Sequence, residues 1–200
     1  MKLRNTGRWL LTGATALFIS GAGAQVPVTP AAVPKDRLAA CGACHGADGH
    51  SVLPGVPSLA AQPRIFLENY LVLTREGIRG SEVMQALLKG LTDREIIALA
   101  IHYNGLAPKP PGAATDPARV QRGREVADRH HCGSCHLPDY AGQQQVPRLA
   151  AQREDFLYES MVAYQQNKRA GGDTMMAASL YGLTDADLKA LAHYLAHFVK

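Results

Sequence analysis

The sequence predicts an all-α protein made of two copies of one helical module, and three observations support this prediction. The motif Cys-x-x-Cys-His occurs at residues 41–45 and again at residues 132–136, an offset of 91 positions. The stretch "VPSLAAQ" at residues 56–62 returns as "VPRLAAQ" at residues 146–152. Apolar residues recur at helical spacing in both copies, and no run alternates apolar and polar residues. A repeat at a nearly constant offset indicates tandem duplication of one folded unit.

The first 24 residues have the pattern of a secretory signal peptide. Three basic side chains and no acidic one come first, an apolar run of 12 residues follows, and small residues stand at Ala22 and Ala24. We expect cleavage after Ala24, so that the mature chain starts at Gln25 and is exported to the periplasm. A membrane anchor is the weaker alternative, because spanning a bilayer takes about 20 apolar residues. We expect no membrane span after the signal is removed.

The charge balance argues against a nucleic-acid-binding protein. The full chain has 21 Lys and Arg residues against 17 Asp and Glu residues. Three of the basic residues belong to the predicted signal peptide, so the mature chain carries 18 basic against 17 acidic side chains. A nearly neutral chain does not form the basic surface that nucleic-acid binding requires.

The two copies are separated by a stretch that is rich in proline. Residues 107–117 read "APKPPGAATDP" and contain four prolines, a composition that is typical of an extended linker. We therefore expect a first domain at residues 25–108, a linker at residues 109–116 and a second domain at residues 117–200. A domain of about 80 residues has a marginal apolar core of its own, which favours packing around a large apolar cofactor.

Each copy is expected to contain three helices, the first of which leads into the Cys-x-x-Cys-His motif. In the second copy this helix covers residues 117–131, and its counterpart at residues 34–40 is shorter. The middle helix is expected within residues 63–77 in the first copy and residues 153–169 in the second. Both stretches combine apolar residues at helical spacing with polar residues between them.

The closing helix of each copy starts at a capping signal. Thr92 stands three residues before Glu95, which is the capping-box pattern, and Thr184 stands three residues before Asp187, which imitates it. An apolar stripe at helical spacing follows each signal. The stripe residues are Ile96, Leu99 and Tyr103 in the first copy, and Leu188, Leu191 and Leu195 in the second.

All four cysteines lie in the two repeated motifs, and a histidine follows each pair directly. Cys-x-x-Cys-His is the attachment signature of c-type haem. Residues three apart on a helix share a face, so each pair of thiols can form thioether bonds to the two vinyl groups of one porphyrin. Disulfides, a thiol oxidoreductase or one shared zinc are the alternatives, but none needs these histidines. The motifs predict two haem c groups, attached through Cys41, Cys44, Cys132 and Cys135.

The histidine that ends each motif is the expected axial ligand of the iron, namely His45 in the first copy and His136 in the second. The other ring nitrogen is expected to donate to a backbone carbonyl, which fixes the ring. On the opposite side of the iron we expect Met84 and Met176. Each of them stands seven residues before the leucine of a Leu-Thr-Asp sequence.

Other residues compete for the second axial position. Met175 is the alternative to Met176, and a methionine in either copy can also be ordinary core filler. His50 or His102 would instead give bis-histidine ligation, which lowers the reduction potential relative to histidine–methionine ligation. A histidine–methionine pair fills both axial positions, which favours electron transfer over chemistry with oxygen or peroxide.

These residues resemble the cytochrome c4 family, bacterial dihaem cytochromes c made of two tandem class I domains. The resemblance covers the mature chain and rests on both Cys-x-x-Cys-His motifs, on "VPSLAAQ" and "VPRLAAQ", and on the methionine before each closing helix. It implies that the carbonyls of Pro57 and Pro147 accept a hydrogen bond from the ligand histidines. It also implies a Leu-Ala-x-Tyr pattern in the closing helix, from which the first copy departs, because His102 stands where tyrosine is usual.

The resemblance implies an electron carrier rather than an enzyme. The expected donors are a quinol-oxidising complex or a dehydrogenase, and the expected acceptor is a terminal oxidase or reductase. The alternative is a dihaem electron-transfer subunit of a dehydrogenase, for example of a flavocytochrome c sulfide dehydrogenase. Catalysis by the chain itself, as a dihaem peroxidase or a thiosulfate-oxidising enzyme, disagrees with its small size and its paired methionines.

Overall fold

The protein is described by a computed structural model that covers residues 33–110, 112, 114–169 and 174–198, and the predicted signal peptide lies outside these residues. The all-α prediction is confirmed, because the described residues form no strand beyond an isolated bridge between Gln143 and Val146. The helices are, in chain order, α1 (Lys35–His45), α2 (Arg64–Arg75), α3 (Glu82–Leu88), α4 (Asp93–Asn104), α5 (Pro117–Arg129), α6 (Cys132–His136), α7 (Glu154–Gln165), α8 (Thr174–Ser179) and α9 (Asp185–Ala196).

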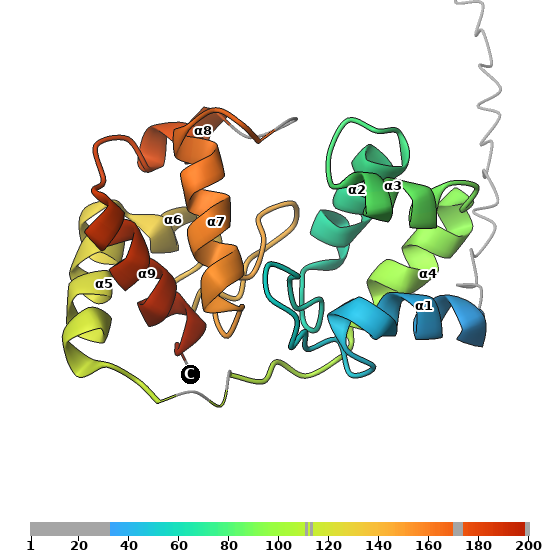
Figure 1. The fold of residues 1–200 in the computed structure, drawn as a ribbon, viewed down its shortest axis with the longest axis horizontal. Coiled ribbons are helices and arrows are strands. Elements are labelled where there is room, and N and C mark those ends of the chain that lie inside the picture. The colour runs from blue at the N-terminus through green and yellow to red at the C-terminus, as the bar shows by residue number, and fades with distance from the viewer. Residues whose placement is uncertain (1–32, 111, 113, 170–173, 199–200) are drawn as a thin grey trace, which may run out of the picture.

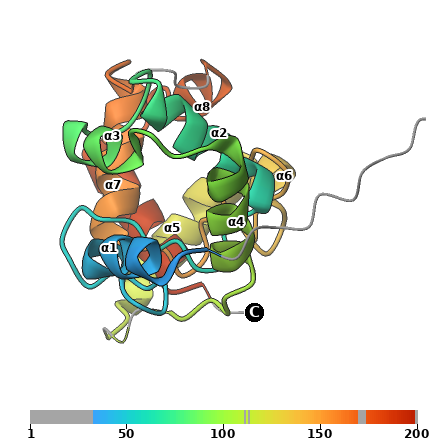
Figure 2. The same cartoon turned by 90° about the vertical axis from the view of Figure 1, so that its right-hand side faces the viewer.

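The helices form two groups that lie side by side. Figure 1 shows α1–α4 in one half and α5–α9 in the other, and Figure 2 views the molecule with the first half in front of the second. No helix among the described residues combines the length and the hydropathy that a membrane crossing requires. Between α4 and α5, residues 105–110 and 114–116 lie along one side of both groups.

Each half packs around its own apolar core. In the first half the core includes Leu67 of α2 and Leu88 of α3, and in the second it includes Leu157 of α7 and Val126 of α5. The closing helices α4 and α9 supply the centre of each core. Every residue of the two predicted apolar stripes is at most 4% exposed: Ile96, Leu99, Tyr103, Leu188, Leu191 and Leu195.

Both closing helices begin at the predicted capping boxes. The Thr92 hydroxyl accepts from the Glu95 N–H at 3.3 Å, and the Glu95 carboxylate accepts from the Thr92 N–H at 2.8 Å. Thr184 and Asp187 form the same pair of bonds at 3.2 and 3.1 Å. The Thr184 hydroxyl, with the Arg122 guanidinium, lowers the pKa of Asp187 to about 2. The capping signals in the sequence therefore located both helix starts correctly.

The structure differs from the three-helix prediction in two places. A short helix carries each candidate methionine, α3 in the first half and α8 in the second, and neither was expected. Helices of six or seven residues are too short to show a clear helical period in sequence. The helices that carry the two Cys-x-x-Cys-His motifs also differ from each other. In the first half, α1 continues through the motif to His45, whereas in the second half His131 (φ 53°) separates α5 from α6.

The two halves face each other through the repeated "VPxLAAQ" segments. The Gln152 side chain accepts from the Ser58 N–H at 2.8 Å and donates to the Ser58 carbonyl at 2.9 Å. Gln62, the repeat counterpart of Gln152, forms the same two bonds with the backbone of Arg148, both at 3.0 Å. We call these four bonds the glutamine clamp. Ser58 and Arg148 are repeat counterparts too, so the clamp joins equivalent segments reciprocally.

Separation of the halves should follow when the glutamine clamp is removed. Gln62→Leu combined with Gln152→Leu leaves buried backbone groups of Ser58 and Arg148 without partners, at about 1–3 kcal/mol for each group. We expect a larger radius of gyration in small-angle scattering with unchanged helicity. The matched control is Gln121→Leu, since Gln121 bonds only to Glu125 at an exposed site. An unchanged radius in the double variant would show that other contacts hold the halves together.

Candidate haem sites

The histidines of the two motifs are buried and held in one orientation. His45 at the end of α1 is 6% exposed, and His136 at the end of α6 is 4% exposed. The Nδ1 atom of His45 lies 2.7 Å from the carbonyl oxygen of Pro57, and that of His136 lies 2.8 Å from the carbonyl oxygen of Pro147. Because a carbonyl only accepts, Nδ1 carries the proton, and Nε2 is left with a free lone pair.

The electrostatics of these histidines suit a metal ligand. Burial lowers the pKa of His45 and of His136, because it disfavours the charged imidazolium. Both rings are therefore neutral at physiological pH. A neutral imidazole with Nδ1–H bonded to a backbone carbonyl is the usual arrangement of a metal-bound histidine.

The four cysteines form no disulfide with one another and stand at the first and fourth positions of their motifs. Cys41 and Cys132 are half-buried, whereas Cys44 and Cys135 are exposed. Burial raises the pKa of Cys41, and it raises that of Cys132 to about 11. Cysteines that exchange disulfides have lowered pKa values instead, so the thiol oxidoreductase alternative is disfavoured.

The cysteines also do not assemble into one zinc site. In the part of the chain that the structure describes, the only group of three metal-ligating side chains within reach of one ion is Glu154, His193 and His197. No cysteine belongs to it. The shared-zinc alternative therefore has no support among these residues.

One candidate methionine packs against each core, as does the half-buried cysteine of the same half. Met84 and Cys41 both contact the first core, and Met176 and Cys132 both contact the second. Met175 lies next to Met176 in sequence but is 71% exposed and does not belong to the core. Each half thus brings a cysteine of its Cys-x-x-Cys-His motif and its candidate methionine to the same apolar cluster. The second cluster also contains Met161, which is 6% exposed and has no methionine counterpart in the first half.

Three of the remaining histidines contact neighbouring residues. The Nδ1 of His50 lies 3.3 Å from the Asp48 carboxylate, and the His102 ring meets Tyr103 edge-on. His193 is buried and uses both ring nitrogens, because Nδ1 donates to Glu154 at 2.8 Å and Nε2 accepts from the Asp116 N–H at 2.9 Å. The second Glu154 oxygen binds Arg119. Because both nitrogens of His193 and both oxygens of Glu154 have hydrogen-bond partners, the Glu154–His193 group is a hydrogen-bond network that connects α5, α7 and α9.

Loss of this network should destabilise the second half. His193→Leu leaves the Asp116 N–H and one oxygen of the Glu154 carboxylate without their partner. We expect the free energy of unfolding to fall by about 2 kcal/mol, measured by urea denaturation of the haem-loaded protein. Glu154→Gln keeps an acceptor for the His193 Nδ1–H, so its free energy of unfolding should fall by less than that of His193→Leu. Equal stability of His193→Leu and the parent protein would contradict the assigned network.

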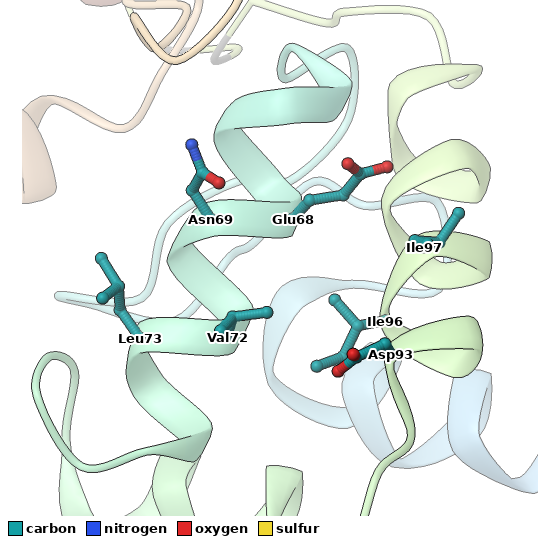
Figure 3. Close-up of a pocket in the computed structure, with 7 residues that line it drawn as sticks. All are labelled: Glu68, Asn69, Val72, Leu73, Asp93, Ile96 and Ile97. Carbon is teal, nitrogen blue, oxygen red and sulfur yellow. The ribbon is translucent and has the colours of Figure 1, made fainter.

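A shallow surface cleft lies away from the motifs. It has a volume of about 430 Å³ and is bounded by α2 and α4, with Val72 and Ile96 on its facing sides (Figure 3). None of its lining residues is a predicted haem contact: Glu68, Asn69, Val72, Leu73, Asp93, Ile96 and Ile97. This cleft is therefore not a haem site.

The donor set of each half fits haem c. It contains two cysteines one helical turn apart that form no disulfide, a buried neutral imidazole whose Nε2 can bind a metal, and a methionine thioether on the same apolar core. When bound, haem iron supplies a one-electron Fe(III)/Fe(II) couple, whose potential depends on the axial ligands.

Sequence reasoning did not single out three residues that the structure makes prominent, namely Gln62, Gln152 and Arg148. All three lie in the repeated "VPxLAAQ" segments. Their recurrence in both copies is the signal that could have found the two glutamines. Their partners are about 90 residues away, so no local pattern reveals the contact.

Comparisons with known proteins identify the class of protein. The family model described as Cytochrome c matches residues 120–198. A curated relative, cytochrome c4 of Thiocapsa roseopersicina, is 32% identical and covers 78% of this chain and 85% of its own length. The thiosulfate dehydrogenase electron acceptor of Thiomonas intermedia is 32% identical and covers 85% of this chain and 83% of its own.

A solved structure is similar over both halves. The crystal structure of reduced recombinant cytochrome c4 from Pseudomonas stutzeri matches with a TM-score of 0.75 and 26% sequence identity. The match covers 82% of this chain and 96% of that chain. Together with the paired motifs, the all-α fold and the relative at 32% identity, it shows that this chain belongs to the cytochrome c4 family, electron carriers with two class I cytochrome c domains and two haem c groups.

Proposed function

We propose that the protein carries electrons in the periplasm from a quinol-oxidising complex or a dehydrogenase to a terminal oxidase or reductase. In this proposal Cys41, Cys44, Cys132 and Cys135 attach the two haems, and the domains span residues 25–108 and 117–200. The axial pairs are His45 with Met84 and His136 with Met176. Pro57 and Pro147 orient the ligand histidines through their carbonyls.

One observation supports this proposal above all others. Each half holds a buried histidine whose Nδ1 is fixed by a proline carbonyl, and a methionine packed on the same core as the half-buried cysteine. His45 with Met84, and His136 with Met176, would hold the iron of a bound haem on both sides, so that the haem could gain and lose an electron with little rearrangement. They also leave no open position for substrate, which favours transfer over catalysis.

Exposed apolar side chains near both candidate methionines suit brief contact with redox partners. In the first half Val83 and Leu87 flank Met84 on α3, and they are 67% and 43% exposed. In the second half Met175 lies beside Met176 and is 71% exposed. Since the mature chain is nearly neutral, we expect small, transient contacts rather than strong electrostatic steering.

A spectroscopic redox titration of the purified protein tests this function. We expect two one-electron couples per chain, and an absorption band of the methionine–iron bond in the oxidised protein that accounts for both haems. The potentials should lie above those of bis-histidine haems. A protein that lacks this band, or that turns over peroxide steadily, would contradict the proposed carrier.

A second candidate is the electron-accepting partner of a dehydrogenase. The sequence first suggested a flavocytochrome c sulfide dehydrogenase subunit, and the relative at 32% identity is named as a thiosulfate dehydrogenase electron acceptor. The rate at which each candidate donor reduces the protein, measured by stopped flow, distinguishes this second candidate from the first. Fast reduction by a thiosulfate dehydrogenase with thiosulfate, and slow reduction by a quinol-oxidising complex, would favour the second candidate. Co-purification of a flavoprotein would favour the sulfide dehydrogenase subunit.

A further inference from the structure

Arg148 is a buried cation at the contact between the two halves. It follows Pro147, whose carbonyl accepts the Nδ1–H of His136, and its own backbone is held by Gln62. Arg148 is 6% exposed, and its Nε atom is completely covered but has no hydrogen-bond partner. Among the described residues, no carboxylate pairs with its guanidinium.

A buried guanidinium without an anion is costly. Removing a charge from water costs several kcal/mol unless a partner compensates for it. Burial alone lowers the pKa of Arg148 to about 10, with no opposing contribution from a neighbouring charge, so the group stays charged at neutral pH. The missing anion must therefore come from something that the described polypeptide does not supply.

The repeat counterpart in the first half is different. Ser58 occupies the position equivalent to Arg148 and is equally buried, at 6% exposure. Its hydroxyl accepts from the Ser51 N–H at 3.2 Å. The first half thus places a small, satisfied hydroxyl where the second half places an unpaired cation, although the backbones of both residues are clamped in the same way.

The location of Arg148 identifies the anion. Each haem c brings two propionate carboxylates, and the residue before Arg148 holds the ligand histidine of the second half. An ion from solvent is a poor alternative, because the side chain is almost entirely covered. We propose that the Arg148 guanidinium binds a propionate of the haem in the second half and thereby raises the reduction potential of that haem alone. This inference rests on the haem assignment of the proposed function.

The expected direction follows from electrostatics. An unneutralised propionate near the iron stabilises the ferric form, whereas a guanidinium that binds the propionate offsets its charge and favours the ferrous form. The guanidinium fork matches a carboxylate with two hydrogen bonds, which lysine cannot reproduce fully. Arg148 is thus a positioning residue that acts on the iron through the propionate.

The test is a redox titration of Arg148→Ser and Arg148→Gln in the haem-loaded protein. We expect one of the two couples to move down, with at least about a tenfold change in the ratio of reduced to oxidised haem at a fixed potential, or about 59 mV. The other couple should stay unchanged. Arg148→Lys should recover part of the shift, because it keeps the charge but loses the fork.

A matched control removes another arginine from the same contact. Arg153 donates to the Ser51 carbonyl across the halves, but Asp155 pairs with it at 2.7 Å. Arg153→Gln should leave both couples in place. The proposal is overturned if Arg148→Ser changes neither couple, or if Arg153→Gln shifts the same couple as much. Two haems per chain and an intact methionine–iron band in these variants would show that the proposed function itself still holds.

A measurement on the unmodified protein covers the case in which the variants fail to mature. In a nitrogen-15 spectrum with sequential assignments, the Arg148 Nε–H should exchange slowly with water. Its resonance should also shift between the reduced and oxidised protein, because a bound propionate holds it near a paramagnetic iron. A rapidly exchanging Arg148 Nε–H, or one that does not sense the oxidation state, overturns the proposal.

Discussion

Replacing Met176 with alanine should remove the sixth ligand from one of the two haem irons and leave the other iron six-coordinate. Alanine has no donor atom, so the second-half haem loses its sixth ligand, whereas the first half keeps Met84. We expect the methionine–iron band to fall to about half and the reduced protein to bind about one carbon monoxide per chain, against none for the parent. The potential of the opened haem should fall as well.

The neighbouring methionine provides the control for this experiment. Met175 is 71% exposed and lies outside the core that Met176 contacts. Met175→Ala should therefore keep the full band and bind no carbon monoxide. Met84→Ala should also reduce the methionine–iron band to about half, in this case through the first haem. The double variant Met84→Ala with Met176→Ala should abolish the band. A full band in Met176→Ala with a reduced band in Met175→Ala would reverse the ligand assignment.

Replacing Gly123 with valine should cost the second half more stability than any other single change considered above. Gly123 is the point where α5 crosses α9, and a Cβ there would overlap the backbone of Ala190 and the side chain of Tyr194. Overpacking of this kind costs about 1–3 kcal/mol or more, out of a total stability of about 5–15 kcal/mol. We expect a loss of at least about 3 kcal/mol in urea denaturation.

Alanine at the same position separates sterics from helix propensity. Propensity alone would make Gly123→Ala about 1 kcal/mol more stable, so a net loss identifies the close helix crossing as the cause. The control is Gly112→Ala, since a Cβ at Gly112 meets no atom within 4 Å. This control should change the stability by less than about 0.5 kcal/mol. Stabilisation by Gly123→Ala would mean that the two helices are farther apart.

The longer helices could be predicted because their signals are local. Capping residues stand three positions apart, and apolar stripes repeat every three to four residues, so both closing helices were found with their correct starts. The short helices α3 and α8 gave no such signal. Their seven and six residues are stabilised by contacts with each core rather than by a period of their own.

The candidate haem sites were also predictable in part. The cysteines and histidines are adjacent in sequence, so the spacing alone specified the chemistry. The choice of Met176 over Met175 relied on the repeat register, and the structure adds that, of these two methionines, Met176 contacts the second core and Met175 does not belong to it. No pattern in the sequence indicated that Arg148 is buried, since an arginine is usually exposed.

The sequence by itself determined the all-α fold and revealed the duplication, and it supplied the residues that we propose to bind two haems. The helix signals and the Cys-x-x-Cys-His motifs depend on neighbours within one or two helical turns, and the duplication is visible as repeated sequence. Only the tertiary structure decided how the halves face each other and which side chains lie between them. The glutamine clamp joins residues 86 and 94 positions apart, and it holds the backbone of the buried Arg148 against the opposite half. Such contacts arise when two separately folded cores exclude water from a common surface, and that surface does not exist until both halves have folded.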